Sequence, residues 1–147
     1  MKRTSPHLRT EYWHFQQITA RWADNDAYGH VNNVVYYSWF DTIVNTLLIR
    51  QGVLDVERSP VIGLVIESHC TYFAPLAFPQ IIEAGLRVAT LGNSSVRYDI
   101  ALFASGETIA AAQGYLVHVM VDRENRQSTP IPAPMRILLQ SLMEIAP

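Results

Sequence analysis

The spacing of apolar residues changes along the chain from a strand-like to a helix-like period. Residues 15–22, FQQITARW, alternate in part between apolar and polar side chains, which is typical of a half-buried strand. From about Asn33 one face carries apolar side chains at spacings of four, three and four, namely Tyr36, Phe40, Ile43 and Leu47. This pattern predicts a mostly buried helix that ends near Gln51, because Gly52 can take the left-handed conformation that closes a helix.

Four further apolar segments predict strands after this helix. They are residues 61–73, 80–91, 95–104 and 108–122. The short separators GNS and SGE suit tight hairpins between antiparallel neighbours, and the tail TPIPAPMRILLQSLMEI predicts a short amphipathic helix. One strand, one long buried helix and four long strands predict an α+β fold in which a five-stranded antiparallel sheet wraps around the helix.

Composition is consistent with one globular domain over residues 1–147, since 49% of the residues are hydrophobic and 16% are charged. The net charge is -2 and the basic residues are scattered, so we expect no nucleic-acid or membrane partner. The first residues, MKRTSPHLRTEYWHF, lack the apolar core of a signal peptide, which favours a cytoplasmic protein. A lone cysteine, Cys70, excludes an intramolecular disulfide.

A polar segment stands immediately before the predicted helix. Residues 23–41, ADNDAYGHVNNVVYYSWFD, bring two carboxylates, a histidine and two asparagines to the helix start. Turn formation and helix capping account for most of these residues. Free backbone N–H groups at a helix start can also stabilise an oxyanion, while a nearby carboxylate attacks a carbonyl or activates water. The segment could therefore support acyl transfer.

The string from Asp24 to Asp41 closely resembles the motif of hotdog-fold acyl thioesterases of the 4-hydroxybenzoyl-CoA thioesterase family. GHVNN followed by a tyrosine also resembles a repeat of plant-type acyl-carrier-protein thioesterases. The likeness continues through IESHCTYFAPL, LGNSSVRYDIAL and VDRENRQSTPIP, which covers almost the whole chain. It implies the hotdog fold, an acyl-CoA or acyl-carrier-protein thioester as substrate, and no metal or redox cofactor, with coenzyme A only as part of the substrate. It also implies a homodimer or homotetramer whose sheets join edge to edge.

The resemblance assigns roles to several residues of this segment. Asp26, the second acid of the D-x-D pair, would be the catalytic nucleophile or general base. The backbone N–H of Asn33 would be the oxyanion donor, and Tyr36 would line the acyl or thioester channel. His30 and Asn32 would either orient water or Asp26, or stabilise the turn.

Two further comparisons with the family concern how the coenzyme A part of the substrate is bound and which acyl group it carries. Ser95 and Arg97 resemble nucleotide contacts, and the phosphates of coenzyme A require cationic partners, although a solvated hairpin explains both residues equally well. Arg123 and Arg126 are weaker candidates for the same task. Aryl-CoA members of the family carry apolar and aromatic residues where this chain has HVNN, which favours fatty or short branched acyl groups.

Other polar residues fit structural roles better. Asp41 flanks the apolar helix face and is predicted to face solvent or an interface, and Glu67 and His69 are too few for a metal site. Two rival functions stay open. An enoyl-CoA hydratase of the same fold pairs aspartate and histidine about five residues apart around a proline, whereas Asp26 and His30 are four apart without one. A non-catalytic acyl-CoA binding protein is the other alternative.

Overall fold

Five strands and two α-helices account for most of residues 3–143, the part of the chain that the computed structural model describes. In chain order the elements are β1 (His14–Thr19), α1 (Val35–Arg50), β2 (Val61–Tyr72), β3 (Ile81–Leu91), β4 (Ser95–Ala104), β5 (Ala112–Asp122) and α2 (Ala133–Ser141). The predicted α+β architecture, with a five-stranded antiparallel sheet, one long helix and a short helix in the tail, is confirmed. The last two residues of the tail segment that predicted the second helix lie outside the described range.

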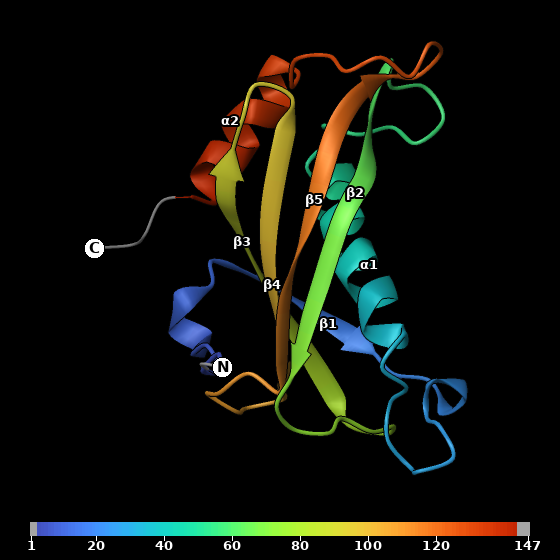
Figure 1. The fold of residues 1–147 in the computed structure, drawn as a ribbon, viewed down its shortest axis with the longest axis vertical. Coiled ribbons are helices and arrows are strands. Elements are labelled where there is room, and N and C mark those ends of the chain that lie inside the picture. The colour runs from blue at the N-terminus through green and yellow to red at the C-terminus, as the bar shows by residue number, and fades with distance from the viewer. Residues whose placement is uncertain (1–2, 144–147) are drawn as a thin grey trace.

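The strands follow the order β1-β3-β4-β5-β2, and every neighbouring pair is antiparallel. Hairpins join β3 to β4 and β4 to β5. The first is tight, over residues 92–94, as predicted, whereas the second connection is longer than predicted and runs over residues 105–111. β2 does not pair with β3, which follows it in sequence, but with β5. Within the described chain, β1 and β2 therefore form the two edges of the sheet (Figure 1).

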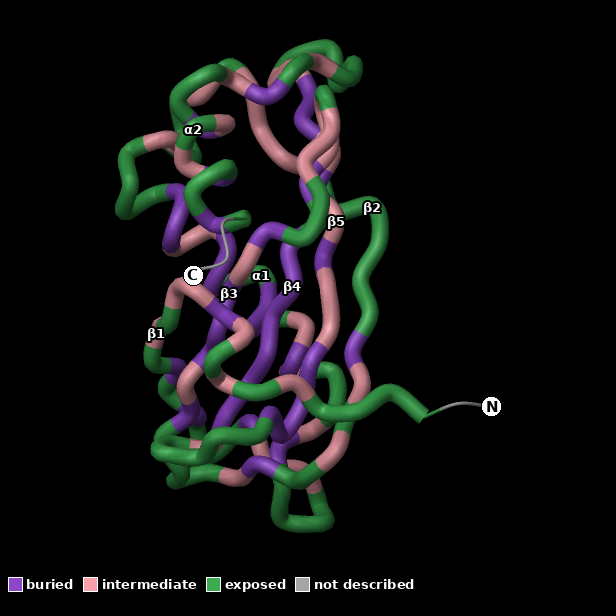
Figure 2. The backbone as a smooth tube through the Cα atoms, turned by 90° about the vertical axis from the view of Figure 1, so that its left-hand side faces the viewer, coloured by how far each residue is buried: buried purple, intermediate pink, exposed green. Residues whose placement is uncertain are grey.

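The core lies between α1 and the inner face of the sheet (Figure 1). The four helix residues that set the apolar period are buried, and so are the side chains of β4 that face them, Tyr98, Ile100 and Leu102. Figure 2 shows that the central strands are largely buried, whereas β2 is largely exposed. Packing along its length fixes α1 against the sheet, which holds the start of the helix at one end of the fold.

Two strand boundaries differ from the prediction by three or more residues. β1 ends at Thr19 instead of residue 22, because the chain turns there into the short 3-10 helix Trp22–Asp24. β5 begins at Ala112 instead of residue 108. The preceding residues bond the N-terminal segment instead, since the Arg9 N–H donates to the Thr108 carbonyl at 2.8 Å and the Ala110 N–H to the His7 carbonyl at 2.9 Å.

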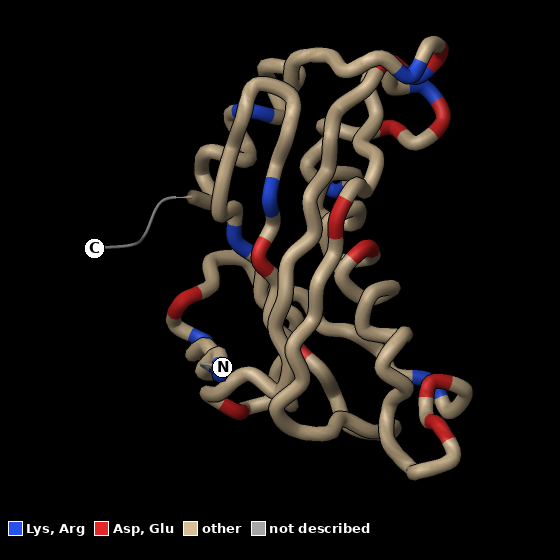
Figure 3. Tube along the Cα trace, viewed as in Figure 1, with Lys and Arg blue, Asp and Glu red and all other residues tan. Residues whose placement is uncertain are grey.

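Charged residues are spread over loops, strands and helices rather than gathered in one region (Figure 3). Within residues 3–143, no helix has both the length and the apolar character needed to cross a membrane.

Candidate active site

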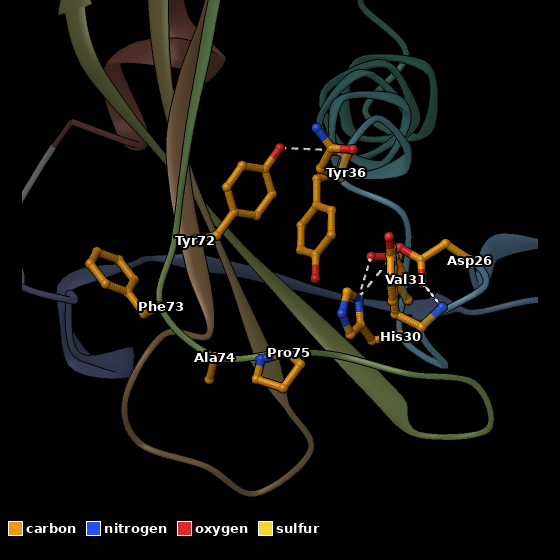
Figure 4. A pocket seen from close by; sticks show the side chains of 10 residues that line it. Asp26, His30, Val31, Tyr36, Tyr72, Phe73, Ala74 and Pro75 are labelled. Carbon is orange, nitrogen blue, oxygen red and sulfur yellow. Dashed lines mark hydrogen bonds and ion pairs between the residues drawn. The ribbon is translucent and has the colours of Figure 1, made fainter.

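A cavity of about 460 Å³ lies at the start of α1, between the loop that precedes the helix and the loop that follows β2 (Figure 4). The two loops are tied together. The Val31 N–H donates to the Leu76 carbonyl at 2.7 Å, and the Phe78 N–H donates to Oδ1 of Asn25 at 3.0 Å. The residues that line the cavity are Asp26, Tyr28, His30, Val31, Asn33, Tyr36, Tyr72, Phe73, Ala74 and Pro75.

The two acids of the D-x-D pair have different surroundings. The Asp24 side chain is only 2% exposed, and its carboxylate accepts hydrogen bonds from the backbone N–H of Arg21 at 2.7 Å and from Nη2 and Nε of Arg21 at 2.9 and 3.2 Å. Burial alone raises the pKa of Asp24, but the hydrogen bonds from Arg21 outweigh it and hold that pKa below its ordinary value. Asp24 is thus fully engaged in holding the turn.

Asp26, in contrast, reaches the cavity with part of its carboxylate free. Its side chain is 19% exposed, and Oδ1 accepts the Tyr28 N–H at 2.8 Å. The Gly29 N–H closes the turn on the Asp26 carbonyl at 3.1 Å, and Gly29 adopts a φ of 86°, which favours glycine. The backbone of its own turn therefore orients the Asp26 carboxylate and leaves Oδ2 facing His30.

His30 lies beside this free oxygen. Its Nδ1 is 3.6 Å from Oδ2 of Asp26 and 3.5 Å from the Val31 carbonyl oxygen, and its ring stacks on Tyr28. These contacts suit both predicted roles, which are the orientation of Asp26 and the stabilisation of the turn.

The segment just before α1 supplies a further residue to the same cavity. Asn33 lines the cavity, and no hydrogen bond found within residues 3–143 uses its N–H. Tyr36 also lines the cavity and is buried, which raises the pKa of its hydroxyl. Asn32 is not part of the lining. Its Oδ1 accepts the Val34 N–H at 3.1 Å, so its side chain supports the helix start.

Ser95 and Arg97 lie elsewhere. Ser95 begins β4 at the β3–β4 turn, at the opposite end of the sheet from the start of α1 (Figure 1). The Arg97 guanidinium lies 4.0 Å from the centre of the Tyr115 ring, and its Nε is 3.3 Å from Asp99. Arg97 contributes to a second cavity, of about 270 Å³, on the outer face of the sheet. Within one chain these residues do not meet Asp26.

The remaining candidates have the structural surroundings that the sequence suggests. Asp41 is exposed and bonds Asn45, and Glu67 accepts the Tyr115 hydroxyl at 2.7 Å. Cys70 is buried, and burial raises the pKa of its thiol to about 11. Across residues 3–143, no three histidine, cysteine or acidic residues gather as metal ligands do.

Sequence reasoning missed the far wall of the cavity, which Tyr72 and the segment 73–75 supply. A signal for it exists. A strand that follows a long helix through a short connection runs back along that helix, so its last residues return to the helix start. The end of IESHCTYFAPL could have been assigned to the site on this ground.

Residues 20–139 match the sequence profile of the thioesterase-like superfamily. The chain belongs to this superfamily. The predicted membership of a hotdog-fold thioesterase family is confirmed, and the family places the protein among the thioester hydrolases.

Relatives of this thioesterase-like protein cover nearly its whole length. It is 56% identical to the PA5185 protein from Pseudomonas aeruginosa strain PAO1, over 97% of this chain and 99% of that one, with a TM-score of 0.93. It is 29% identical to PA2801, a putative thioesterase from Pseudomonas aeruginosa, over 85% and 96% of the two chains, with a TM-score of 0.78. It is 25% identical to the 1,4-dihydroxy-2-naphthoyl-CoA hydrolase of Synechococcus elongatus, over 87% of this chain and 95% of that protein.

Proposed function

We propose that this protein is an acyl-CoA thioesterase that hydrolyses a fatty or short branched acyl thioester to the free acid and the thiol. One observation carries the proposal: Asp26, whose carboxylate is partly free, and Asn33, whose backbone N–H is not used by a hydrogen bond found within residues 3–143, line the same cavity. A carboxylate and an unused backbone donor at a helix start are the two elements that acyl transfer requires. Similarity to a named acyl-CoA hydrolase supports the same reaction.

In the proposed reaction the thioester carbonyl oxygen accepts a hydrogen bond from the Asn33 N–H, and the positive end of the α1 dipole stabilises its developing charge. Two routes then follow. Asp26 can take a proton from water as the water oxygen bonds the carbonyl carbon, after which the C–S bond breaks and the thiol leaves with that proton. Alternatively, Asp26 bonds the carbonyl carbon itself and expels the thiolate, and water hydrolyses the resulting mixed anhydride.

The proposed acyl group is aliphatic because HVNN stands at the helix start, where aryl-CoA members of the family carry apolar and aromatic residues. The Synechococcus elongatus relative is named for an aromatic acyl group, so aryl-CoA thioesters belong in the same test. The experiment is thiol release from acyl-CoAs running from acetyl to palmitoyl, with branched and aryl members included. Release from aliphatic substrates supports the whole proposal, whereas release from aryl substrates alone keeps the reaction and corrects the acyl group.

A protein that releases no thiol from any acyl-CoA would be tested with the same acyl groups on an acyl carrier protein. Absence of release from both kinds of thioester contradicts the proposed activity. Binding of acyl-CoA without release would then favour the non-catalytic binding protein, and loss of the enoyl absorbance of crotonyl-CoA would favour the hydratase.

Arg97 is proposed to serve the nucleotide end of coenzyme A, together with Ser95. Since this end carries several phosphate charges, replacing Arg97 with alanine is expected to raise KM for an acyl-CoA several-fold. The matched substrate is the same acyl group on pantetheine, which lacks the nucleotide, and its KM should not change. An equal effect on both substrates, or on neither, would argue against this assignment.

The proposal includes a homodimer or homotetramer. β2 is 12 residues long, pairs only with β5 among residues 3–143, and exposes Leu64, Val65 and Ile66. An unpaired edge of this kind can pair with a second copy. Light scattering should give a mass of two or four chains, and a monomer at micromolar concentration would contradict the proposal.

A further inference from the structure

The peptide that carries the proposed oxyanion donor is held on both sides by backbone hydrogen bonds. The Asn33 N–H belongs to the peptide that joins Asn32 to Asn33. The carbonyl of this peptide accepts the Val35 N–H at 3.0 Å, and the preceding N–H, that of Asn32, donates to the Asp24 carbonyl at 2.9 Å. The fully engaged Asp24 turn thus anchors one side of the donor peptide.

Side chains hold the next peptide, between Asn33 and Val34, at both of its ends. Its N–H donates to Oδ1 of Asn32 at 3.1 Å, and its carbonyl accepts the hydroxyl of Tyr72 at 2.8 Å (Figure 4). A peptide unit is planar, so two hydrogen bonds at opposite ends fix its orientation. The orientation of this unit in turn limits the rotation of the neighbouring donor peptide.

Tyr72 makes this contact from a different element of the fold. It is the last residue of β2 and lies 39 positions after Asn33 in the sequence. Its ring meets the Tyr36 ring edge-on, with centroids 4.9 Å apart and planes at 87°. The ring contact directs the hydroxyl, and the hydroxyl connects the edge of the sheet to the start of α1.

We propose that Tyr72 is a positioning residue, which aims the Asn33 N–H at the thioester carbonyl oxygen by holding the Asn33 carbonyl, with Asn32 holding the other end of the same peptide. The inference rests on the proposed thioesterase function. An oxyanion donor is effective only when it is already oriented towards the charge that develops, and loops need supporting contacts to achieve this. No covalent step passes through Tyr72.

The test is the Tyr72→Phe variant, which removes the hydroxyl and keeps the ring that packs on Tyr36. We expect kcat to fall about 10-fold with little change in KM, since the lost contact acts on the transition state more than on substrate binding. Water can replace the hydroxyl on the Asn33 carbonyl, so thermal stability should change little. The matched control is Tyr12→Phe, which removes a hydroxyl bonded to His7, outside the cavity that Asp26 and Asn33 line, and should leave kcat unchanged.

A spectroscopic measurement separates positioning from a merely structural role. The probe is a non-hydrolysable acyl-CoA analogue in which a methylene group replaces the sulfur, with ¹³C at its ketone carbonyl. Hydrogen bonding from the Asn33 N–H should lower the C=O stretching frequency in the wild-type complex. We expect a smaller lowering in Tyr72→Phe, because the donor is less well aimed.

A second variant keeps the inference testable if Tyr72→Phe does not fold. Asn32→Ala frees the N–H end of the same peptide and should show the same loss of kcat and the same smaller frequency shift. Asn32→Ser keeps an oxygen acceptor and should lose less.

Three outcomes would overturn the inference. An unchanged kcat and an unchanged carbonyl frequency in Tyr72→Phe would show that the hydroxyl does not position the donor. A raised KM with unchanged kcat would make Tyr72 a substrate contact instead. If the wild-type protein hydrolyses no thioester, the proposed function itself is wrong. This outcome can be told apart from the first two, because both of those require an active wild type.

Discussion

Replacement of Asp26 by asparagine is expected to lower kcat/KM for thioester hydrolysis by about 10²–10⁴-fold, the range typical of losing a general base. The side-chain amide is neither a base nor a nucleophile at neutral pH. It retains an Oδ1 that can accept the Tyr28 N–H, so the turn that orients residue 26 should persist. Thiol release from the best substrate of the acyl-CoA panel measures the effect.

Asp41→Asn is the matched control for this variant. Asp41 has the same chemistry, but it is exposed on α1 and does not line the cavity. Its loss should leave kcat/KM within a factor of about two, as expected for a solvated residue outside the site. The reverse result, with Asp26→Asn active and Asp41→Asn inactive, would move the reaction to the helix face. Unfolding curves of both variants separate a chemical loss from a loss of folded protein.

The helix start was predictable from sequence because its signals are local. The acids, the glycine and the apolar period lie within one stretch of chain, and the structure places Asp26, His30, Asn33 and Tyr36 around one cavity. Contacts with residues nearby in the sequence also explain why the Asp24 and Asp26 carboxylates have different surroundings. The Asp24 carboxylate accepts hydrogen bonds from Arg21, three residues earlier, while the Asp26 carboxylate accepts the Tyr28 N–H of its own turn and lies 3.6 Å from His30.

The far wall of the cavity depends on strand order, which periodicity does not give. Tyr72 meets Asn33 because β2 crosses to the far side of β5 and runs back to the start of α1. The alternation of apolar and polar residues correctly separates Arg97 from its buried neighbours Val96 and Tyr98. The alternation does not show at which end of the sheet β4 begins. The cavity that Arg97 can reach depends on that end.

Replacement of Phe40 by alanine is expected to lower the free energy of unfolding by about 3–5 kcal/mol. Phe40 is fully buried on α1, where the helix crosses the inner face of the sheet. The substitution removes the apolar surface of the ring and leaves a cavity that the surrounding strands cannot close, because hydrogen bonds to both neighbours fix the central strands of the sheet. Chemical denaturation at one fixed protein concentration measures the change, since association would add to the apparent stability.

Ile49→Ala is the matched control, because it also shortens an apolar side chain of α1, but one that is exposed. Its cost should stay within about 0.5 kcal/mol. A similarly small loss of unfolding free energy for Phe40→Ala would mean that packing against the sheet does not hold the helix in place. That result would also weaken the account of the site, because the position of the Asn33 amide relative to Asp26 depends on a helix that cannot slide. A strong destabilisation by Phe40→Ala would instead show that core packing holds α1 in place. If the folded fraction of that variant also keeps the KM of the wild type, the loop contacts set the geometry of the cavity.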